Sequence, residues 1–144
     1  MQFNQASVIR VILVIVGAFI VFVGVNVAFG GIQTLGWQVA QGFVSVTNEP
    51  NFLIQDNHVR FLGGVFGAVG VMLLLGATNL GRYQAELRLV FVLIFVGGLA
   101  RFSSMQPTVI FGAGVVTSLI TELVVMPILF FWLPRVVSKP SKNG

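Results

Sequence analysis

Long, nearly unbroken runs of apolar residues, separated by short polar stretches, dominate the chain. A helix that crosses a hydrocarbon core about 30 Å thick needs about 20 predominantly apolar residues. The runs therefore predict spanning helices at about residues 11–29, 59–77, 87–103 and 109–133. The pattern predicts an all-α fold, a four-transmembrane-helix bundle that forms a single integral membrane domain over residues 1–144.

The first apolar run follows a partly polar decapeptide that ends in Arg10. This outline also fits a cleaved signal peptide, whose apolar segment is about 7–15 residues long. The run over residues 11–29 is longer than that, and Asn26-Val27-Ala28 is a poor cleavage site. We therefore expect this helix to be retained.

Glycine, glutamine and asparagine replace most apolar residues between Gly30 and His58. We expect this stretch to form a long external loop, with turn residues at Pro50 and at Asp56-Asn57. Within it, apolar residues recur at helical spacing, and Trp37 adds a ring that prefers membrane interfaces. These apolar residues are Ile32, Leu35, Val39 and Phe43. The spacing predicts a short amphipathic surface helix in this first external loop.

Small residues at intervals of four indicate packing surfaces on several helices. Gly63 and Gly67 form a GxxxG motif, and Gly64 and Ala68 form a second step of the same kind. In lipid, this spacing lets neighbouring backbones approach closely. The residues predicted to pack helices are Gly63, Gly64, Gly67, Gly97, Gly98, Gly114 and Ser118. A ligand pocket is the less favoured interpretation, because the motif is common in membrane helices.

The composition favours a membrane protein and excludes several functions. The chain is 56% hydrophobic and 8% charged, with a mean hydropathy of +0.98. Its eight Lys and Arg residues are scattered around helix ends, so no basic patch for nucleic acid is predicted. The lack of cysteine excludes disulfides and thiolate chemistry, and the single His58 excludes a self-contained histidine-rich metal site.

Recognised catalytic motifs are missing from the sequence. It contains no HExxH, no GxSxG, no Walker loop and no ligand-spaced cluster of carboxylates. We therefore expect no enzymatic activity, no catalytic residue, no metal and no cofactor. His58 could ligate a haem or metal jointly with another subunit, although a solvated loop histidine is far more common.

The positive charges predict an orientation. Cytoplasmic flanks of short loops accumulate Lys and Arg. The basic residues at the two termini and at the second-to-third hinge are Arg10, Arg82, Arg88, Arg135, Lys139 and Lys142. In a four-span bundle these segments share one side of the membrane. We expect a multi-pass protein of the bacterial inner membrane with both termini in the cytoplasm.

Apart from Arg88 at the first turn of the third span, three charged residues lie inside or at the edge of the predicted spans: Arg60, Arg101 and Glu122. A charge near the bilayer centre costs about 2.5–3.5 kcal/mol on insertion scales, so such residues usually find a partner. The helical rise places Arg101 and Glu122 about 8 Å apart in depth, which extended side chains bridge. We expect these two to form a buried ion pair just before a bend at Pro127.

Arg60, at the outer mouth of the second span, is expected to reach Asp56, a lipid phosphate or another anion. Three interpretations of the charged residues remain. In the first, the Arg101–Glu122 pair fixes helix register, and the Arg60 side chain extends to the lipid headgroups. In the second, Arg60, Arg101 and Asp56 belong to an anion- or lipid-binding pocket. In the third, Glu122 carries protons.

Several short segments resemble a known family. They are DNHVRFLGGVFGAVG at residues 56–70, GGLARFSS at residues 97–104, and Thr121-Glu122-Leu123. They resemble an uncharacterised family of small four-helix bacterial membrane proteins, catalogued as a domain of unknown function. The family pattern maps onto Arg60, Gly63, Gly64, Arg101 and Glu122, while Ala100 replaces the glycine of a Gly-Arg pair. The resemblance implies a fold and no particular activity.

Three classes of function fit these features. The first is an accessory or structural subunit of a larger membrane assembly, with a membrane-protein partner or self-association. The second is an anionic-lipid or small-ligand binding protein that uses an Arg/Glu pocket. The third is a small proton-coupled transporter, resembling four-helix exporters that place their acid in the first helix, whereas Glu122 lies in the fourth span. Membrane lipids surround the protein in every case.

Overall fold

The computed structural model describes residues 4–34 and 45–138, which contain helices and no strand. Within this part of the chain, four helical stretches are long and apolar enough to cross a membrane. They are Gln5–Gly30, Glu49–Thr78, Gln84–Ser104 and Ala113–Val137. The prediction of an all-α chain with four apolar helices is confirmed. The surface helix predicted around Leu35, Val39 and Phe43 lies outside the described residues.

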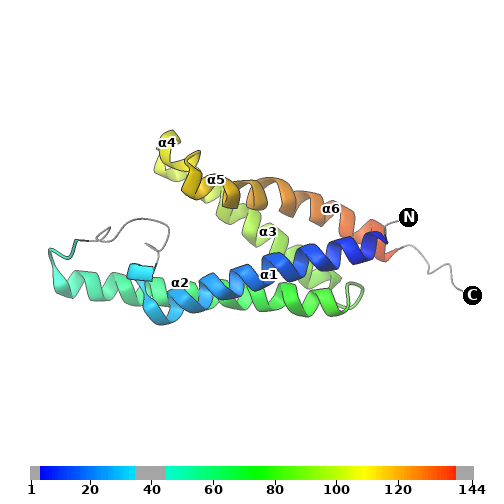
Figure 1. Ribbon diagram of the computed structural model, residues 1–144, viewed down its shortest axis with the longest axis horizontal. Helices are drawn as coiled ribbons and strands as arrows, with labels where there is room; N and C mark the ends of the chain where they lie inside the picture. The colour runs from blue at the N-terminus through cyan, green and yellow to red at the C-terminus, as the bar shows by residue number, and fades with distance from the viewer. Residues whose placement is uncertain (1–3, 35–44, 139–144) are drawn as a thin grey trace, which may run out of the picture. The chain divides into compact units, whose positions relative to one another are not determined.

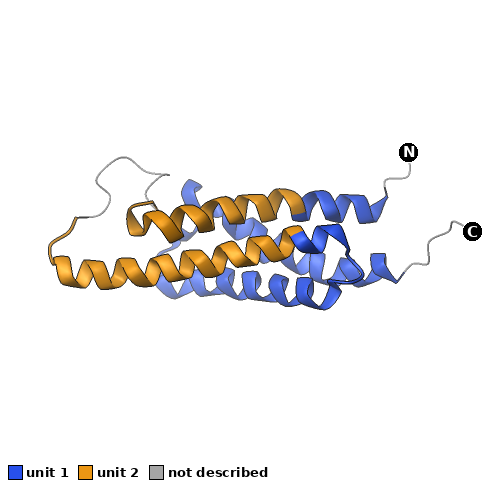
Figure 2. Ribbon diagram, turned by 90° about the horizontal axis from the view of Figure 1, so that it is seen from below, with its two compact units in different colours: residues 1–13, 75–144 blue, residues 14–74 orange. Residues whose placement is uncertain are grey.

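The chain divides into two compact units, shown in different colours in Figure 2. Unit 2, Val14–Leu74, holds most of helices α1 (Gln5–Gly30) and α2 (Glu49–Thr78). Unit 1 comprises Met1–Leu13 and Leu75–Gly144. Its other elements are α3 (Gln84–Ala100), η2 (Arg101–Ser104), α4 (Pro107–Ile110), α5 (Ala113–Ile120), η3 (Thr121–Val125) and α6 (Met126–Val137). Figure 1 labels the α-helices among them.

In unit 2, glycines bring the backbones of α1 and α2 into direct contact. A Cβ atom added to Gly24 would lie 2.5 Å from Cα of Gly67, and one added to Gly63 would lie 2.5 Å from the backbone nitrogen of Ala28. Because both obstacles are backbone atoms, no side-chain rotation would relieve them. Close backbone approach of this kind gives van der Waals contact between helices that the hydrophobic effect does not supply in lipid.

Helix α2 begins earlier than the sequence pattern indicates. The expected loop to His58 ends at Asn48, whose side-chain Oδ1 accepts the backbone N–H of Asn51 at 3.1 Å. This bond caps the helix, and Pro50 is tolerated because the first turn of a helix has no intrahelical N–H bonds to lose. The polar segment before His58 therefore extends α2 instead of forming turns. At 30 residues, α2 is about 45 Å long, so its polar first turns exceed a hydrocarbon core about 30 Å thick.

In unit 1, α3 packs along α6 and their facing side chains form the core. Fully buried side chains recur on α6 at spacings of three and four and on α3 at a spacing of four, which places each set on one helix face. They are Leu87, Phe91, Met126, Leu129 and Leu133. The end of α2 joins this core closely, because a Cβ on Gly76 would lie 2.7 Å from Cγ of Leu87.

The chain reverses after α3 at Met105, which has a left-handed φ of 51°. Gln106 has a non-helical backbone, with φ of −118° and ψ of 86°, as expected for a residue that precedes proline, and Pro107 starts the short α4. The backbone of Gly112 is extended, so the long fourth helix starts at Ala113 and continues to Val137. The fourth span therefore begins and ends later in the chain than the predicted span at residues 109–133.

Three of the predicted packing residues do not serve that purpose in the structure. A Cβ at Gly64 or Gly97 would meet no atom within 4 Å, and Gly114 is exposed. Each lies on a helix face turned away from its neighbour, which the spacing of small residues alone does not reveal. Ser118 is half-buried, and Gly63, Gly67 and Gly98 lie on helix faces that contact a neighbouring helix.

The glycine contacts predict graded effects of adding one methyl group. Gly24→Ala should lower the free energy of unfolding by about 1–3 kcal/mol, because its Cβ collides with the backbone of α2. Gly67→Ala should cost less, since its Cβ would lie 3.7 Å from Cα of Gly24. Gly97→Ala, whose added Cβ also meets open space, is the matched control. Thermal unfolding in detergent measures all three, and equal stability of the Gly24 and Gly97 variants would contradict the packing.

Candidate functional site

The structure brings Arg101 and Glu122 together in unit 1. Nε of Arg101 donates to Oε2 of Glu122 at 2.7 Å, and Nη2 donates to Oε1 at 2.6 Å. Such a two-bond fork is the strongest geometry available to an arginine and a carboxylate. The Glu122 side chain is 14% exposed and that of Arg101 is 39% exposed. The carboxylate is therefore held inside the unit, while one edge of the guanidinium stays accessible.

Gly98 makes this pair possible. It lies one turn before Arg101 on α3, and a Cβ there would lie 2.8 Å from Cβ of Glu122. The missing side chain lets the glutamate lie against the α3 backbone, within reach of the arginine. Arg101 follows the last residue of α3, where the positive charge also interacts favourably with the helix dipole.

Glu122 lies in a π-helical turn, η3, between α5 and α6. Pro127, the second residue of α6, has no backbone N–H, so the regular α-helical hydrogen bond to the carbonyl of Leu123 is missing. A wider turn accommodates that gap, and such turns occur often at functional sites. The predicted disturbance at Pro127 thus takes the form of a π-helical turn that contains the glutamate itself.

A second cluster of charged groups lies in unit 2, at the turn after α1. Asp56 Oδ2 accepts Nε of Arg60 at 2.6 Å, and Oδ1 accepts the backbone N–H of Ile32 at 2.7 Å. Nη1 of Arg60 donates to the backbone carbonyl of Phe29. The acid and the base, one turn apart on α2, together satisfy a backbone donor and a backbone acceptor at the end of α1.

Gly31 ends α1 in a left-handed conformation with φ of 73°, and its N–H donates to the carbonyl of Val27 at 2.8 Å. This is the αL type of helix C-cap. A Cβ on Gly31 would lie 2.7 Å from Cγ of Asp56. Glycine is therefore required here both by the backbone angle and by the approach of the carboxylate.

The sequence interpretation missed the backbone partners of Asp56 and the role of Gly31. The role of Gly31 could have been predicted from the Gly30-Gly31 pair, because glycine directly after an apolar run is typical of a helix C-cap. It also missed Arg88 as a half-buried residue: the guanidinium carbon of Arg88 lies 4.2 Å from the ring centre of Phe130. Only the packing of α6 on α3 places these two side chains together.

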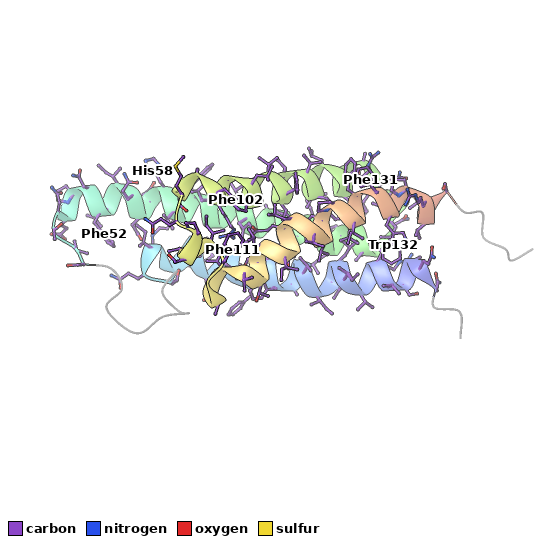
Figure 3. The ribbon with its side chains drawn as sticks, turned by 90° about the horizontal axis from the view of Figure 1, so that it is seen from above. Phe52, His58, Phe102, Phe111, Phe131 and Trp132 are labelled. Atoms are coloured by element: carbon purple, nitrogen blue, oxygen red, sulfur yellow. The ribbon has the colours of Figure 1, made fainter. Side chains whose placement is uncertain are left out.

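The three candidate anion-binding residues form two clusters, Arg101 in unit 1 and Arg60 with Asp56 in unit 2. A pocket that uses both arginines therefore stays a prediction. His58 is exposed on helix α2, not in a loop, as Figure 3 shows. Among the described residues, no group of three or more His, Cys, Asp or Glu side chains is placed to hold a metal ion.

These features define a helical protein with four candidate membrane spans and two internal Arg–carboxylate clusters. Residues 8–133 match the family described as "Domain of unknown function (DUF4345)". The chain belongs to this family, and the prediction of an uncharacterised family is confirmed. No curated protein and no solved structure matches the chain.

The fork in unit 1 predicts strong coupling between its two residues. Arg101→Gln and Glu122→Gln should each destabilise the protein, because each leaves the other charge unpaired. The double variant should lose less than the sum of both, by about 1–3 kcal/mol. Unfolding in detergent measures the cycle, with the exposed Glu86→Gln as a control for loss of one negative charge. Additive losses would show that the pair contributes nothing.

The cluster in unit 2 predicts that Asp56 stabilises the end of α1. Asp56→Ala removes bonds to Arg60 and to the Ile32 N–H, and hydrogen bonds to charged groups contribute about 1.5–3 kcal/mol each. We expect a loss of about 2 kcal/mol or more, seen as a lower thermal midpoint. The neighbouring exposed Asn57→Ala is the control. An equal midpoint for both variants would contradict this role.

Proposed function

We propose that the chain is a multi-pass integral membrane protein that acts as an accessory or structural subunit of a larger membrane assembly. The observation that carries the proposal is where the acidic side chains lie and what they bind. Of the four acids in the sequence, Glu49 and Glu86 are exposed, and Asp56 and Glu122 each bind an arginine. The carboxylates shielded from solvent thus bind arginines and backbone of neighbouring helices, which supports a structural role.

The outer surface supports a membrane location. Large apolar side chains are exposed on each long helix, among them Ile15, Phe61, Leu93 and Ile128, at 53–69%. Monomeric proteins in water rarely expose continuous apolar surface on this scale. In a bilayer these side chains contact lipid tails or the helices of a partner protein.

We place this protein in a bacterial inner membrane with both termini in the cytoplasm. The support is the positive charge at Arg10, Arg82 and Arg135, close to the ends of spans that share one side of a four-span protein. The resemblance of the sequence to small bacterial membrane proteins supports the same location.

Binding of a small anion by Arg60 and Arg101, or proton transport by Glu122, is less well supported. In unit 1, Glu122 already accepts two hydrogen bonds from the guanidinium of Arg101. In unit 2, Asp56 already accepts one from Arg60 and one from the backbone N–H of Ile32. An added anion would compete with a carboxylate held at bonding distance. Likewise, protonation of Glu122 would break the fork and leave Arg101 without its partner.

The surface we assign to a partner helix is the Gly64–Ala68 face of α2. Both residues are exposed, and Gly64 has no atom within 4 Å of an added Cβ. Small residues four apart on an exposed membrane helix allow a second helix to approach closely. A partner protein or a second copy of this chain fits such a face.

This proposal predicts that bulk at Gly64 prevents assembly without unfolding the chain. Purified in mild detergent, the wild type should have the mass of a complex, and Gly64→Ile should shift the protein toward the single-chain mass. Ala18→Ile, which adds similar bulk at an exposed position of α1, is the matched control. A single-chain mass for the wild type, or an unchanged complex with Gly64→Ile, would contradict the proposal.

A further inference from the structure

Arg88 differs from the other arginines that the structure describes. It is half-buried, whereas Arg10, Arg82 and Arg135 are exposed, and Arg60 and Arg101 pair with carboxylates. Within residues 4–34 and 45–138, no carboxylate pairs with Arg88, and its Nε is enclosed without a hydrogen-bond partner. A buried donor left without a partner lowers stability, because it has lost its hydrogen bonds to water.

The guanidinium of Arg88 rests on an aromatic ring. Its central carbon lies 4.2 Å from the ring centre of Phe130 on α6. A cation over an aromatic face at this distance is stabilised electrostatically by the ring. The ring positions the guanidinium but accepts none of its in-plane N–H bonds. Nε stays enclosed, so the donors that a ligand can reach are those of the terminal Nη groups.

Phe130 is also a wall of an apolar groove in unit 1. The groove is lined by residues of α3 and α6, namely Phe91, Val92, Phe95, Met126, Pro127, Phe130 and Phe131. Figure 3 labels Phe131, one of the residues that line this groove. The free space of about 220 Å³ is smaller than the roughly 300–1,000 Å³ of pockets that hold compact small molecules. An open, shallow groove of this size suits part of an extended chain.

Arg88 lies at one end of this groove. Phe91, Val92 and Phe95 follow it by three, four and seven residues, which places them on the same face of α3. Arg88 is four residues from Gln84, the start of the candidate span, a distance of about 6 Å along the axis. In a membrane-spanning α3 the guanidinium is therefore near headgroup level, and the groove continues from it toward the hydrocarbon.

We propose that this groove binds an anionic glycerophospholipid, with one acyl chain against the phenylalanines and Pro127 and the phosphate held by Arg88. A phosphate fits the donor fork of a guanidinium and supplies the negative partner that Arg88 lacks within the described chain. The apolar lining excludes a purely polar anion from the rest of the site. Arg135, exposed five residues after Phe130 on α6, adds positive charge toward the same end.

Native mass spectrometry of the full chain tests the proposal with phosphatidylglycerol and phosphatidylcholine of identical acyl chains. The wild type should retain phosphatidylglycerol preferentially. Arg88→Gln should weaken phosphatidylglycerol binding about tenfold, the loss expected when a charged hydrogen-bonded contact is removed. Arg82→Gln removes the same charge from the exposed hinge and should change binding less than about twofold. Equal binding by Arg88→Gln and wild type, or equal losses in both variants, would overturn the site.

Two further arms test the groove itself. Val92→Trp fills the groove while leaving Arg88 in place, and it should weaken retention of phosphatidylglycerol by a similar factor. Glycerol 3-phosphate, which has the phosphate without acyl chains, should not displace the lipid. Unchanged retention by Val92→Trp, or displacement by glycerol 3-phosphate, would show that the groove takes no part. Thermal midpoints close to the wild-type value show that the variants are folded. Arg88→Lys keeps the charge without the planar fork and should bind phosphatidylglycerol with intermediate affinity.

Discussion

A charged group inside a low-dielectric surrounding must be paired within the protein, because lipid tails offer it no hydrogen bond. This constraint explains the position of Glu122, and Asp56, in the polar first turns of α2, is shielded and paired in the same way. Glu122 meets a two-bond fork from Arg101, and Asp56 divides its two oxygens between Arg60 and a backbone N–H. In both clusters the carboxylate is more shielded than its arginine.

Glycines let the helices come close enough for these pairs to form. Gly98 allows Glu122 to lie against α3, and Gly31 allows Asp56 to reach the end of α1. The contacts between α1 and α2 at Gly24 and Gly63 follow the same principle without any charge. Close backbone packing and ion pairing are therefore coupled. A side chain added at Gly98 would separate Glu122 from its partner, and one added at Gly31 would separate Asp56 from its partners.

Arg88 illustrates the opposite case, a guanidinium that packing orients but does not neutralise. The aromatic ring of Phe130 holds it at the end of an apolar groove, and no carboxylate of the described chain meets it. The two kinds of arginine separate two tasks. The paired arginines maintain the helices, and the unpaired one is available to a molecule from outside.

Much of the candidate site was predictable from sequence because its residues are rare in their surroundings. Arg60, Arg101 and Glu122 stand out as charges in apolar runs, and helical rise alone brings two of them within reach. Asp56 and Arg60 are one turn apart, so their contact needs only a helix. The start of α2 was less accessible to prediction, because its polar first turns have a composition typical of loops. In the structure they are helical, and the helix begins after a cap by Asn48.

By itself, the sequence determined the number, type and approximate position of the long helices, because hydrophobic length and composition act locally along the chain. It also determined which residues need partners. The tertiary structure alone decided which glycines touch a neighbour, since Gly63 and Gly64 are adjacent in sequence but face opposite surroundings. It likewise decided that Arg88 lies on Phe130 and that Asp56 binds the backbone N–H of Ile32 after α1, because such contacts depend on the rotation and register of packed helices, which spacing within one helix does not specify.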